Sequence, residues 1–388
     1  MSTEQTTLAG DLGGIPRLLG RIGKPDGPTL ICLGGIHGNE PAGFLALRRF
    51  FQKIAAQDGF GGRVIGLSGN RRALARNRRF VDQDLNRIWF PNQIASEGSA
   101  AEQSELQEIA QEIRGVLATC AGRVYFLDLH TTSGPGPAFA FLEDTLPNRE
   151  FAFEFPVPMV LGAEEELPGT LVQYLCDLGV TTLGFEAGQH EDPVSVDRAE
   201  AAIWIAMEAA GIVERGTRPE VAEARRTLTK PSRSLPRIVE MRYRKPVEPG
   251  DQFRMAPGFA SFQTIEEGQL MAHDREGPIK AATDGFLLMP LYQEQGQEGY
   301  FVVRPVRAFW LVLSAKLRQL GIERFLHWLP GVRRHPDIPG AFVVDQGTAR
   351  WLAMELFHLL GFRRRGEKGR FLTMSRRAHD LGGGSMAG

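Results

Sequence analysis

The sequence has few cysteines and no long apolar run. Its 388 residues include three cysteines, Cys32, Cys120 and Cys176, at wide spacings and in apolar or helical surroundings, so we expect free thiols rather than disulfides. No apolar run approaches the roughly 20 residues that a membrane-spanning helix needs. The polar N-terminus lacks the basic and apolar regions of a signal peptide. These absences predict a cytoplasmic protein that does not associate with membranes.

The chain also lacks an excess of charge of either sign. Its formal net charge is −1, so no general attraction to nucleic acid is expected. Hydrophobic residues make up 43% and charged residues 23%, as in ordinary globular proteins. The length exceeds what one core usually supports, which predicts more than one domain. No pattern in the sequence specifies an oligomeric state, and a homo-oligomer remains open.

Residues 1–212 alternate short apolar runs with helical stretches, which predicts an α/β domain with a mixed sheet. His37, His130 and Glu186 lie at or just beyond the ends of predicted strands. In open α/β sheets, ligands bind beyond the carboxyl ends of strands. This placement indicates a functional site before any motif is considered.

The remaining chain is divided by changes in composition. Residues 213–235 are charged and contain proline, which predicts a linker. Residues 236–307 consist of short alternating runs separated by turn residues, which predicts a small all-β domain. Residues 308–388 contain helix-like stretches and end in a basic, glycine-rich tail, so we expect a helical C-terminal extension with a disordered tail.

His37 and Glu40, in the motif HGNE, have the residue types and spacing of a metal site. A catalytic zinc of the His₂Glu kind needs one further histidine, and His130 at a strand end is suited to that role. Taken singly, an H-x-x-E pair is common by chance and a strand-end histidine is usually structural. His190, four residues after Glu186, is interpreted as a loop residue.

Five motifs in a fixed order resemble one known family. GGIHGNEPAG, GNRRAL, DQDLNRIW, DLHTTS and GFEAG occur in this order in the succinylglutamate desuccinylases and aspartoacylases, which are related to zinc carboxypeptidases. The resemblance extends from about Pro28 to Val306. It implies a zinc-carboxypeptidase-like α/β/α domain followed by a small β domain that covers the site as a lid.

The resemblance also implies roles for individual residues. It gives one Zn²⁺ per chain, held by His37, Glu40 and His130, with Glu186 as the general base. In this chemistry zinc activates water, and a nearby carboxylate moves the proton to the leaving amine.

Four further positions follow from the same motifs. Arg72 is expected to polarise the scissile carbonyl, and Asn86 with Arg87 to hold a substrate carboxylate. Asp84 is expected to orient the first histidine ligand. Tyr300 is the expected contribution of the β domain to the substrate site.

The predicted activity is zinc-dependent hydrolysis of the amide bond in a small N-acyl amino acid or a similar carboxylate-bearing substrate. One feature departs from aspartoacylases: the helical stretch LPGTLVQYLCDLG contains no arginine to hold a second carboxylate. Two alternatives remain, a metallocarboxypeptidase acting on short peptides and a non-catalytic metal-binding protein whose extension docks a partner. The acyl group and the amine portion are not specified by the sequence.

Overall fold

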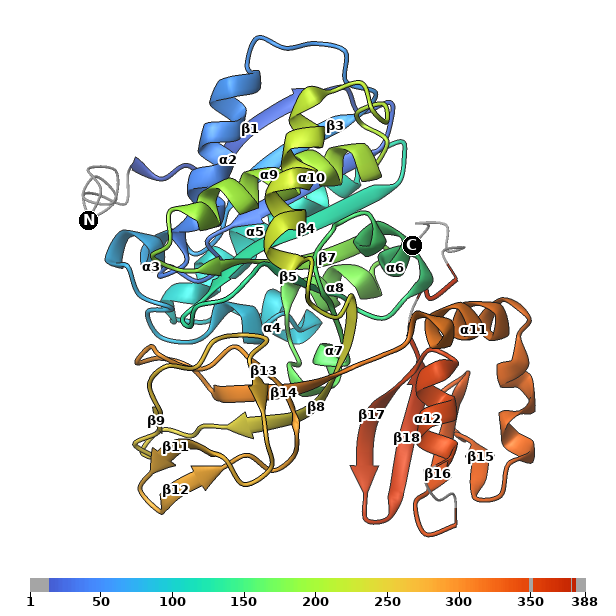
Figure 1. The fold of residues 1–388 in the computed structure, drawn as a ribbon. Coiled ribbons are helices and arrows are strands. Elements are labelled where there is room, and N and C mark those ends of the chain that lie inside the picture. The colour runs from blue at the N-terminus through green and yellow to red at the C-terminus, as the bar shows by residue number, and fades with distance from the viewer. Residues whose placement is uncertain (1–13, 349–351, 378, 382–388) are drawn as a thin grey trace.

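The computed structural model describes residues 14–348, 352–377 and 379–381 (Figure 1). Its centre is an eleven-stranded mixed sheet in the order β1-β3-β2-β4-β7-β5-β6-β8-β14-β13-β10. β2, β3, β4 and β7 run parallel, whereas β1 and β5 run antiparallel to their neighbours β3 and β7. The strands of this first part are β1 (Leu18–Gly23), β2 (Thr29–Gly34), β3 (Arg63–Ser68), β4 (Val124–Thr132), β5 (Phe139–Phe141), β6 (Met159–Leu161) and β7 (Thr181–Gln189).

Helices cover both faces of this sheet, as its apolar strands require. Along β2, Leu30 and Cys32 belong to one core, whereas Ile31 and Leu33 belong to the other, because successive side chains point to opposite faces. The first core is closed by α2 (Pro41–Ile54) and α9 (Val194–Ala209), and the second by α5 (Ala101–Leu117) and α8 (Leu171–Asp177). The α/β/α arrangement predicted from the sequence is confirmed. The shorter helices are α3 (Arg71–Arg76), η2 (Leu85–Arg87), α4 (Pro91–Ala95), α6 (Leu146–Phe153) and α7 (Ala163–Glu166).

The predicted linker contains a helix that the sequence reading missed. Within residues 213–235, α10 (Pro219–Ser232) buries Val221, Ala224 and Leu228 in the same core as α9. Its apolar residues recur at intervals of three and four, the spacing of one helix face, but they are few among many charges. The segment therefore packs onto the α/β domain.

The β unit of residues 236–307 continues the central sheet. β8 (Ile238–Pro246) pairs in parallel with β6, and β14 (Glu298–Pro305), β13 (Gly285–Leu288) and β10 (Thr264–Ile265) follow it in the same sheet. A separate three-stranded sheet of β12 (Gly277–Lys280), β11 (Leu270–Asp274) and β9 (Arg254–Met255) packs beside them. The all-β character is as predicted, and the hydrogen-bonded continuity with the sheet of the α/β part was not foreseen.

The C-terminal extension combines the predicted helices with a four-stranded sheet that was not predicted. α11 (Ala308–Gln319), η3 (Ile322–Trp328) and α12 (Leu352–Leu359) accompany β15 (Val332–Arg334), β16 (Ala341–Asp345), β18 (Phe371–Arg376) and β17 (Phe362–Lys368). The basic segment read as part of a tail forms the β17–β18 hairpin, with Leu372 and Met374 buried in the extension's own core. The final residues of the predicted disordered tail, 382–388, lie outside the described residues.

The extension forms a lobe of its own, connected through the end of β14 (Figure 1). It is held to the α/β part by buried ion pairs. The Arg318 guanidinium, which is fully buried, donates to Asp144 at 2.8 Å and to Asp380 at 2.8 Å. Asp144 lies just before α6 of the α/β part, so Arg318 joins the two regions directly.

All three cysteines are free, with Cys32 and Cys176 buried and Cys120 half-buried. Among the described helices, none has both the length and the apolar character needed to cross a bilayer.

Candidate metal centre and substrate pocket

The loop between β2 and α2 brings two polar side chains to the end of the sheet. Gly35 has φ of +80°, which favours glycine. A Cβ at Gly38 would lie 2.0 Å from the backbone of Ala73, so only glycine fits there. The chain therefore turns tightly between His37 and Glu40, and both side chains are buried.

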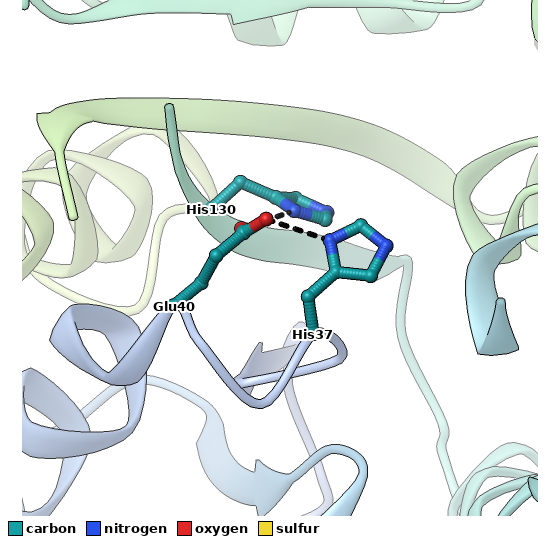
Figure 2. Close-up of side chains that lie close together, drawn as sticks. All are labelled: His37, Glu40 and His130. Carbon is teal, nitrogen blue, oxygen red and sulfur yellow. Dashed lines mark hydrogen bonds and ion pairs between the residues drawn. The ribbon is translucent and has the colours of Figure 1, made fainter. Parts of the chain in front are cut away.

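His37, Glu40 and His130 converge as the sequence predicts (Figure 2). Glu40 Oε1 lies 2.8 Å from His37 Nδ1, and Glu40 Oε2 lies 3.0 Å from His130 Nδ1. One potential ligand atom from each residue lies within 4.8 Å of the others. Two imidazoles and one carboxylate are the donor set of catalytic zinc sites, so these residues could hold a divalent cation.

The Nε2 atom of each histidine lies close to a carboxylate. Asp84 Oδ1 lies 3.1 Å from His37 Nε2, in the position predicted for it. Asp128 Oδ2 lies 3.1 Å from His130 Nε2. Sequence reasoning missed Asp128, although it precedes His130 by two residues on one strand and therefore shares its face. With the Nε2 atoms directed to carboxylates, both Nδ1 atoms face Glu40, an arrangement typical of metal-binding histidines.

The electrostatics of these groups follow from their proximity. Burial acts to raise the pKa of Glu40, but His37 and His130 outweigh it and hold that pKa well below its ordinary value. Burial acts to lower the pKa of His130, but Asp128 and Glu40 raise it well above the usual value. Glu40 therefore favours its anionic form, and the neighbouring His130 favours its protonated form.

Glu186 lies on β7 directly beside His130 in the sheet register. It is buried, it lines the same pocket as the three potential ligands, and its Oε2 has no hydrogen-bond partner among the described residues. Burial raises the pKa of Glu186 to about 8; His130 opposes the rise, while Glu40 and Asp128 add to it. A carboxylate with a raised pKa and a free oxygen is suited to accept and release a proton near neutral pH.

The structure corrects the position of the arginine. Arg72, the predicted residue, is exposed on α3 and is not among the pocket-lining residues. Arg79 lines the pocket instead, with Nη1 3.4 Å from Glu40 Oε1 and Nε 3.0 Å from Asp84 Oδ2. In the helix formed by GNRRAL, Arg72 is exposed and Arg71 pairs with Glu105 and Glu108 of α5, and the chain reaches the pocket only after α3 ends. Residues 71–79 contain five arginines, and no local pattern indicates which of them faces the pocket.

Asn86 and Arg87 line the pocket as predicted. The Asn86 side chain also accepts a hydrogen bond of 3.0 Å from the Leu171 backbone, which fixes it against the start of α8. Arg87 Nη2 donates to Glu298 of β14 at 3.2 Å, and Arg244 donates to the same oxygen at 3.2 Å. The guanidinium expected to hold a substrate carboxylate therefore already faces one carboxylate of the protein.

Tyr300 does not reach the pocket. Its side chain is fully buried in the core of the β unit, stacked against Tyr243 at a ring distance of 5.9 Å, and it is absent from the pocket lining. On β14 neighbouring side chains point to opposite faces, and Phe301 lines the pocket. The structure therefore does not bring Tyr300 together with the other predicted site residues.

The loop between β13 and β14 brings the β unit into contact with the surroundings of the metal centre. Gln293 Oε1 lies 2.7 Å from Asn39 Nδ2 and 2.9 Å from His190 Nε2, and His190 Nδ1 lies 2.8 Å from Thr131 Oγ1. His190, read as a loop residue, thus lines the pocket and joins the β unit to the metal centre. The β unit contributes further lining residues, Met289, Leu291, Gly296, Glu298 and Phe301, and its role as a lid stays a prediction.

Comparison with known proteins agrees with this geometry. Residues 26–204 match the family model described as the Succinylglutamate desuccinylase/Aspartoacylase catalytic domain. A succinylglutamate desuccinylase of Pseudomonas aeruginosa is 38% identical over 113 residues, which are 28% of this chain and 32% of that enzyme. An N-acyl-aromatic-L-amino acid amidohydrolase (carboxylate-forming) of Rattus norvegicus is 32% identical over 103 residues, covering 26% of this chain and 32% of that enzyme.

The fold is shared more widely than the sequence. The crystal structure of a succinylglutamate desuccinylase from Vibrio parahaemolyticus superposes with a TM-score of 0.53 and 16% identity, covering 74% of this chain and 84% of that one. The curated relatives match this chain over about a third of their own length. The resemblance inferred from the five motifs is therefore confirmed for the catalytic part of the chain.

Proposed function

We propose that this chain, whose residues 26–204 form a domain of the succinylglutamate desuccinylase/aspartoacylase family, is a zinc-dependent amidohydrolase that cleaves small N-acyl amino acids. One observation carries the proposal. His37, Glu40 and His130 converge on one point, and Glu186 with an unpartnered oxygen lines the same pocket on the adjacent strand. A purely structural metal site would not need such a carboxylate.

One zinc ion, bound by His37, Glu40 and His130, would supply the Lewis acidity that lowers the pKa of water and polarises an amide carbonyl. The donor set fits this ion, because both histidines present Nδ1 while Asp84 and Asp128 fix their other nitrogens.

Glu186 is the general base and then the general acid. Its free Oε2 takes the proton of the attacking water and passes it to the amide nitrogen, which must be protonated to leave as an amine. The raised pKa of about 8 suits both halves of this transfer, since the proton is neither held too loosely nor too tightly.

Arg79 stabilises the oxyanion that develops on the scissile carbonyl. The Arg79 guanidinium lies beside Glu40 and donates to Asp84. These contacts orient the guanidinium before substrate binds. Asn86 and Arg87 then position the substrate carboxylate, for which a guanidinium offers a bidentate match. Glu298 shares Arg87 and must adjust when that carboxylate arrives.

The β unit favours this function over a peptidase. Lid residues such as Gln293 close the pocket from above and limit the size of the molecule that fits. A small-molecule substrate, a location in the cytoplasm and no nucleic-acid partner are parts of the same proposal.

The test uses purified full-length protein loaded with zinc and a panel of N-acyl amino acids and unblocked dipeptides. We expect acid and amine products from the N-acyl compounds. Release of C-terminal residues from unblocked peptides alone would instead support the carboxypeptidase alternative. Absence of turnover with stoichiometric zinc bound would contradict both and favour the non-catalytic alternative.

A further inference from the structure

The pocket extends beyond the metal centre to a wall with two carboxylates. β5 runs antiparallel to β7, with Phe139 opposite Glu186 and Phe141 opposite Gly184. The chain that continues from Phe141 to Glu143 therefore leads away from the catalytic carboxylate. Glu143 and Glu164, the latter on α7, both line the pocket. They are close enough for the charge of Glu164 to raise the pKa of Glu143.

Apolar side chains line the space between the two ends. They come from β5, α7, the approach to α8 and the lid, and include Phe141, Leu142, Ala163, Leu167, Val172 and Phe301. The two pocket-lining arginines, Arg79 and Arg87, contact residues of the metal centre and Glu298 instead. The far wall thus offers no cation on its lining to receive a second substrate carboxylate.

Glu164 has an oxygen available for a ligand. Its side chain is 7% exposed, Oε1 pairs with Arg377 of the extension, and Oε2 has no partner among the described residues. Glu143, 4% exposed, has Oε2 3.5 Å from Arg363 of the same extension. A buried carboxylate oxygen without a donor is costly unless something supplies one.

We propose that this far wall, Glu143 and Glu164, is a subsite for a positively charged or hydrogen-bond-donating group at the end of an apolar arm of the substrate. The inference rests on the proposed function and names its substrate class: an N-acyl amino acid in which one arm, beyond the scissile amide, ends in an ammonium group. The arm packs on Phe141, Leu167 and Val172, and its ammonium donates to the free oxygen of Glu164. A substrate whose arm ends in a carboxylate meets two acidic side chains and is disfavoured.

Matched substrates test the subsite. For the amine arm they are Nα-acetyl-lysine, Nα-acetyl-norleucine and Nα-acetyl-2-aminoadipate, which have similar length and end in ammonium, methyl and carboxylate. For the acyl arm they are 6-aminohexanoyl-, hexanoyl- and adipoyl-alanine. In one of the two series we expect kcat/KM for the ammonium compound to exceed the methyl compound by about tenfold and the carboxylate compound by more. Equal or inverted preference in both series overturns the proposal.

Variants assign the preference to the wall. Glu164→Gln and Glu143→Gln should each reduce the ammonium preference to below about threefold, while Glu165→Gln should keep it. Glu165 is the matched control, because it lies on α7, contacts the extension through His358 at 3.2 Å and does not line the pocket. Melting temperature and zinc content are measured for each variant. If Glu164→Gln does not fold, the substrate series and the Glu143→Gln variant test the subsite. An unchanged ammonium preference in Glu143→Gln would then contradict the proposal.

Binding separates this inference from the proposed function. If no N-acyl compound is hydrolysed, the proposed function fails, and the subsite is judged by calorimetry on the zinc-loaded protein. The ligands are lysine, norleucine and 2-aminoadipate for the amine arm, and 6-aminohexanoate, hexanoate and adipate for the acyl arm. Tighter binding of the ammonium compound in one set supports the subsite without any turnover. Equal affinities, or tighter binding of the carboxylate compound, in both sets overturn it.

Discussion

Two buried carboxylates, Glu186 in the pocket and Asp144 at the contact with the extension, show how a partner changes the effect of burial on a pKa. Burial raises the pKa of Glu186 to about 8, and its Oε2 has no hydrogen-bond partner among the described residues. Burial acts on Asp144 in the same direction, but Arg318 and Arg149 outweigh it and hold the pKa of Asp144 well below its usual value. Glu186 therefore has an oxygen that remains free to bind a ligand or a proton. The charge of Asp144 is balanced by the two arginines, and its contact with Arg318 joins the extension to the α/β part.

The comparison extends to the surroundings of each residue. The charged groups that act on Glu186 are His130, Glu40, Asp128 and Arg79, and Glu186 Oε2 still has no hydrogen-bond partner among the described residues. Around Asp144 lie permanent guanidinium groups, so that network needs nothing further. A buried carboxylate therefore indicates ligand binding when one of its oxygens has no partner, and domain docking when arginines satisfy both oxygens.

Removal of a metal ligand should break the first region most completely. His37→Ala leaves two of three ligands, and we expect loss of bound zinc and activity reduced to background. Elemental analysis and turnover measure both. His273→Ala, an exposed histidine on β11, is the control and should keep stoichiometric zinc. Stoichiometric zinc in the His37 variant would contradict the assigned triad.

Glu186→Gln separates the base from the metal. The amide keeps the shape but cannot take a proton, so turnover should fall by about 10³-fold or more while zinc content stays at one per chain. Steady-state kinetics and elemental analysis on the same preparation check this. A variant that keeps wild-type turnover would remove Glu186 from the mechanism.

Arg318→Met should break the second region. It leaves Asp144 and Asp380 buried beside fewer cations, which typically costs about 3–5 kcal/mol of stability. Denaturant unfolding measures the loss. Arg334→Met, at an exposed position on β15, is the control and should change stability by less than about 0.5 kcal/mol. Equal stabilities for the two variants would show that the Arg318 contacts do not hold the regions together.

Arg79→Met tests the corrected arginine. We expect kcat/KM to fall by about 10²–10³-fold, the usual effect of losing an oxyanion donor. Arg72→Met changes an exposed side chain and should stay within about twofold of wild type. The reverse ranking would restore the assignment made from the sequence motif.

A smaller effect concerns pH. Burial raises the pKa of Glu143 to about 8; Glu164 adds to the rise, and Arg363 opposes it. A carboxyl group with a raised folded-state pKa stabilises fully below its unfolded pKa of about 4.5, and this contribution disappears as the pH rises through about 8. Glu143→Gln should therefore flatten the decline in melting temperature between pH 5 and 8, by about 2 °C or more. Parallel curves for variant and wild type would show that Glu143 titrates normally.

Sequence reasoning succeeded where a short motif fixes both residue type and place. His37, Glu40, Asp84 and His130 lie together because strand ends and a glycine-bound loop leave little freedom. It failed where the motif gives several equivalent candidates. The direction of Arg72 and Arg79 depends on where α3 ends, and that of Tyr300 and Phe301 on which face of β14 meets the pocket. Neither is determined by local composition.

The fold shows the same division. The alternating strands and helices of the α/β part have strong periodic signals and were foreseen. α10 and the strands of the extension are short or highly charged, and tertiary packing determines them more than local propensity does. The Arg318–Asp144 contact joins residues 174 positions apart, and no local pattern announces it.

The parallel ladder between β6 and β8 restricts how substrate can enter. Since Met159 pairs with Ile238 and Val160 with Val239, the β unit cannot swing away as a rigid door without breaking the backbone hydrogen bonds of one continuous sheet. The contacts of Gln293 with Asn39 and His190 join side chains alone, so they can open while the strands of that sheet stay paired.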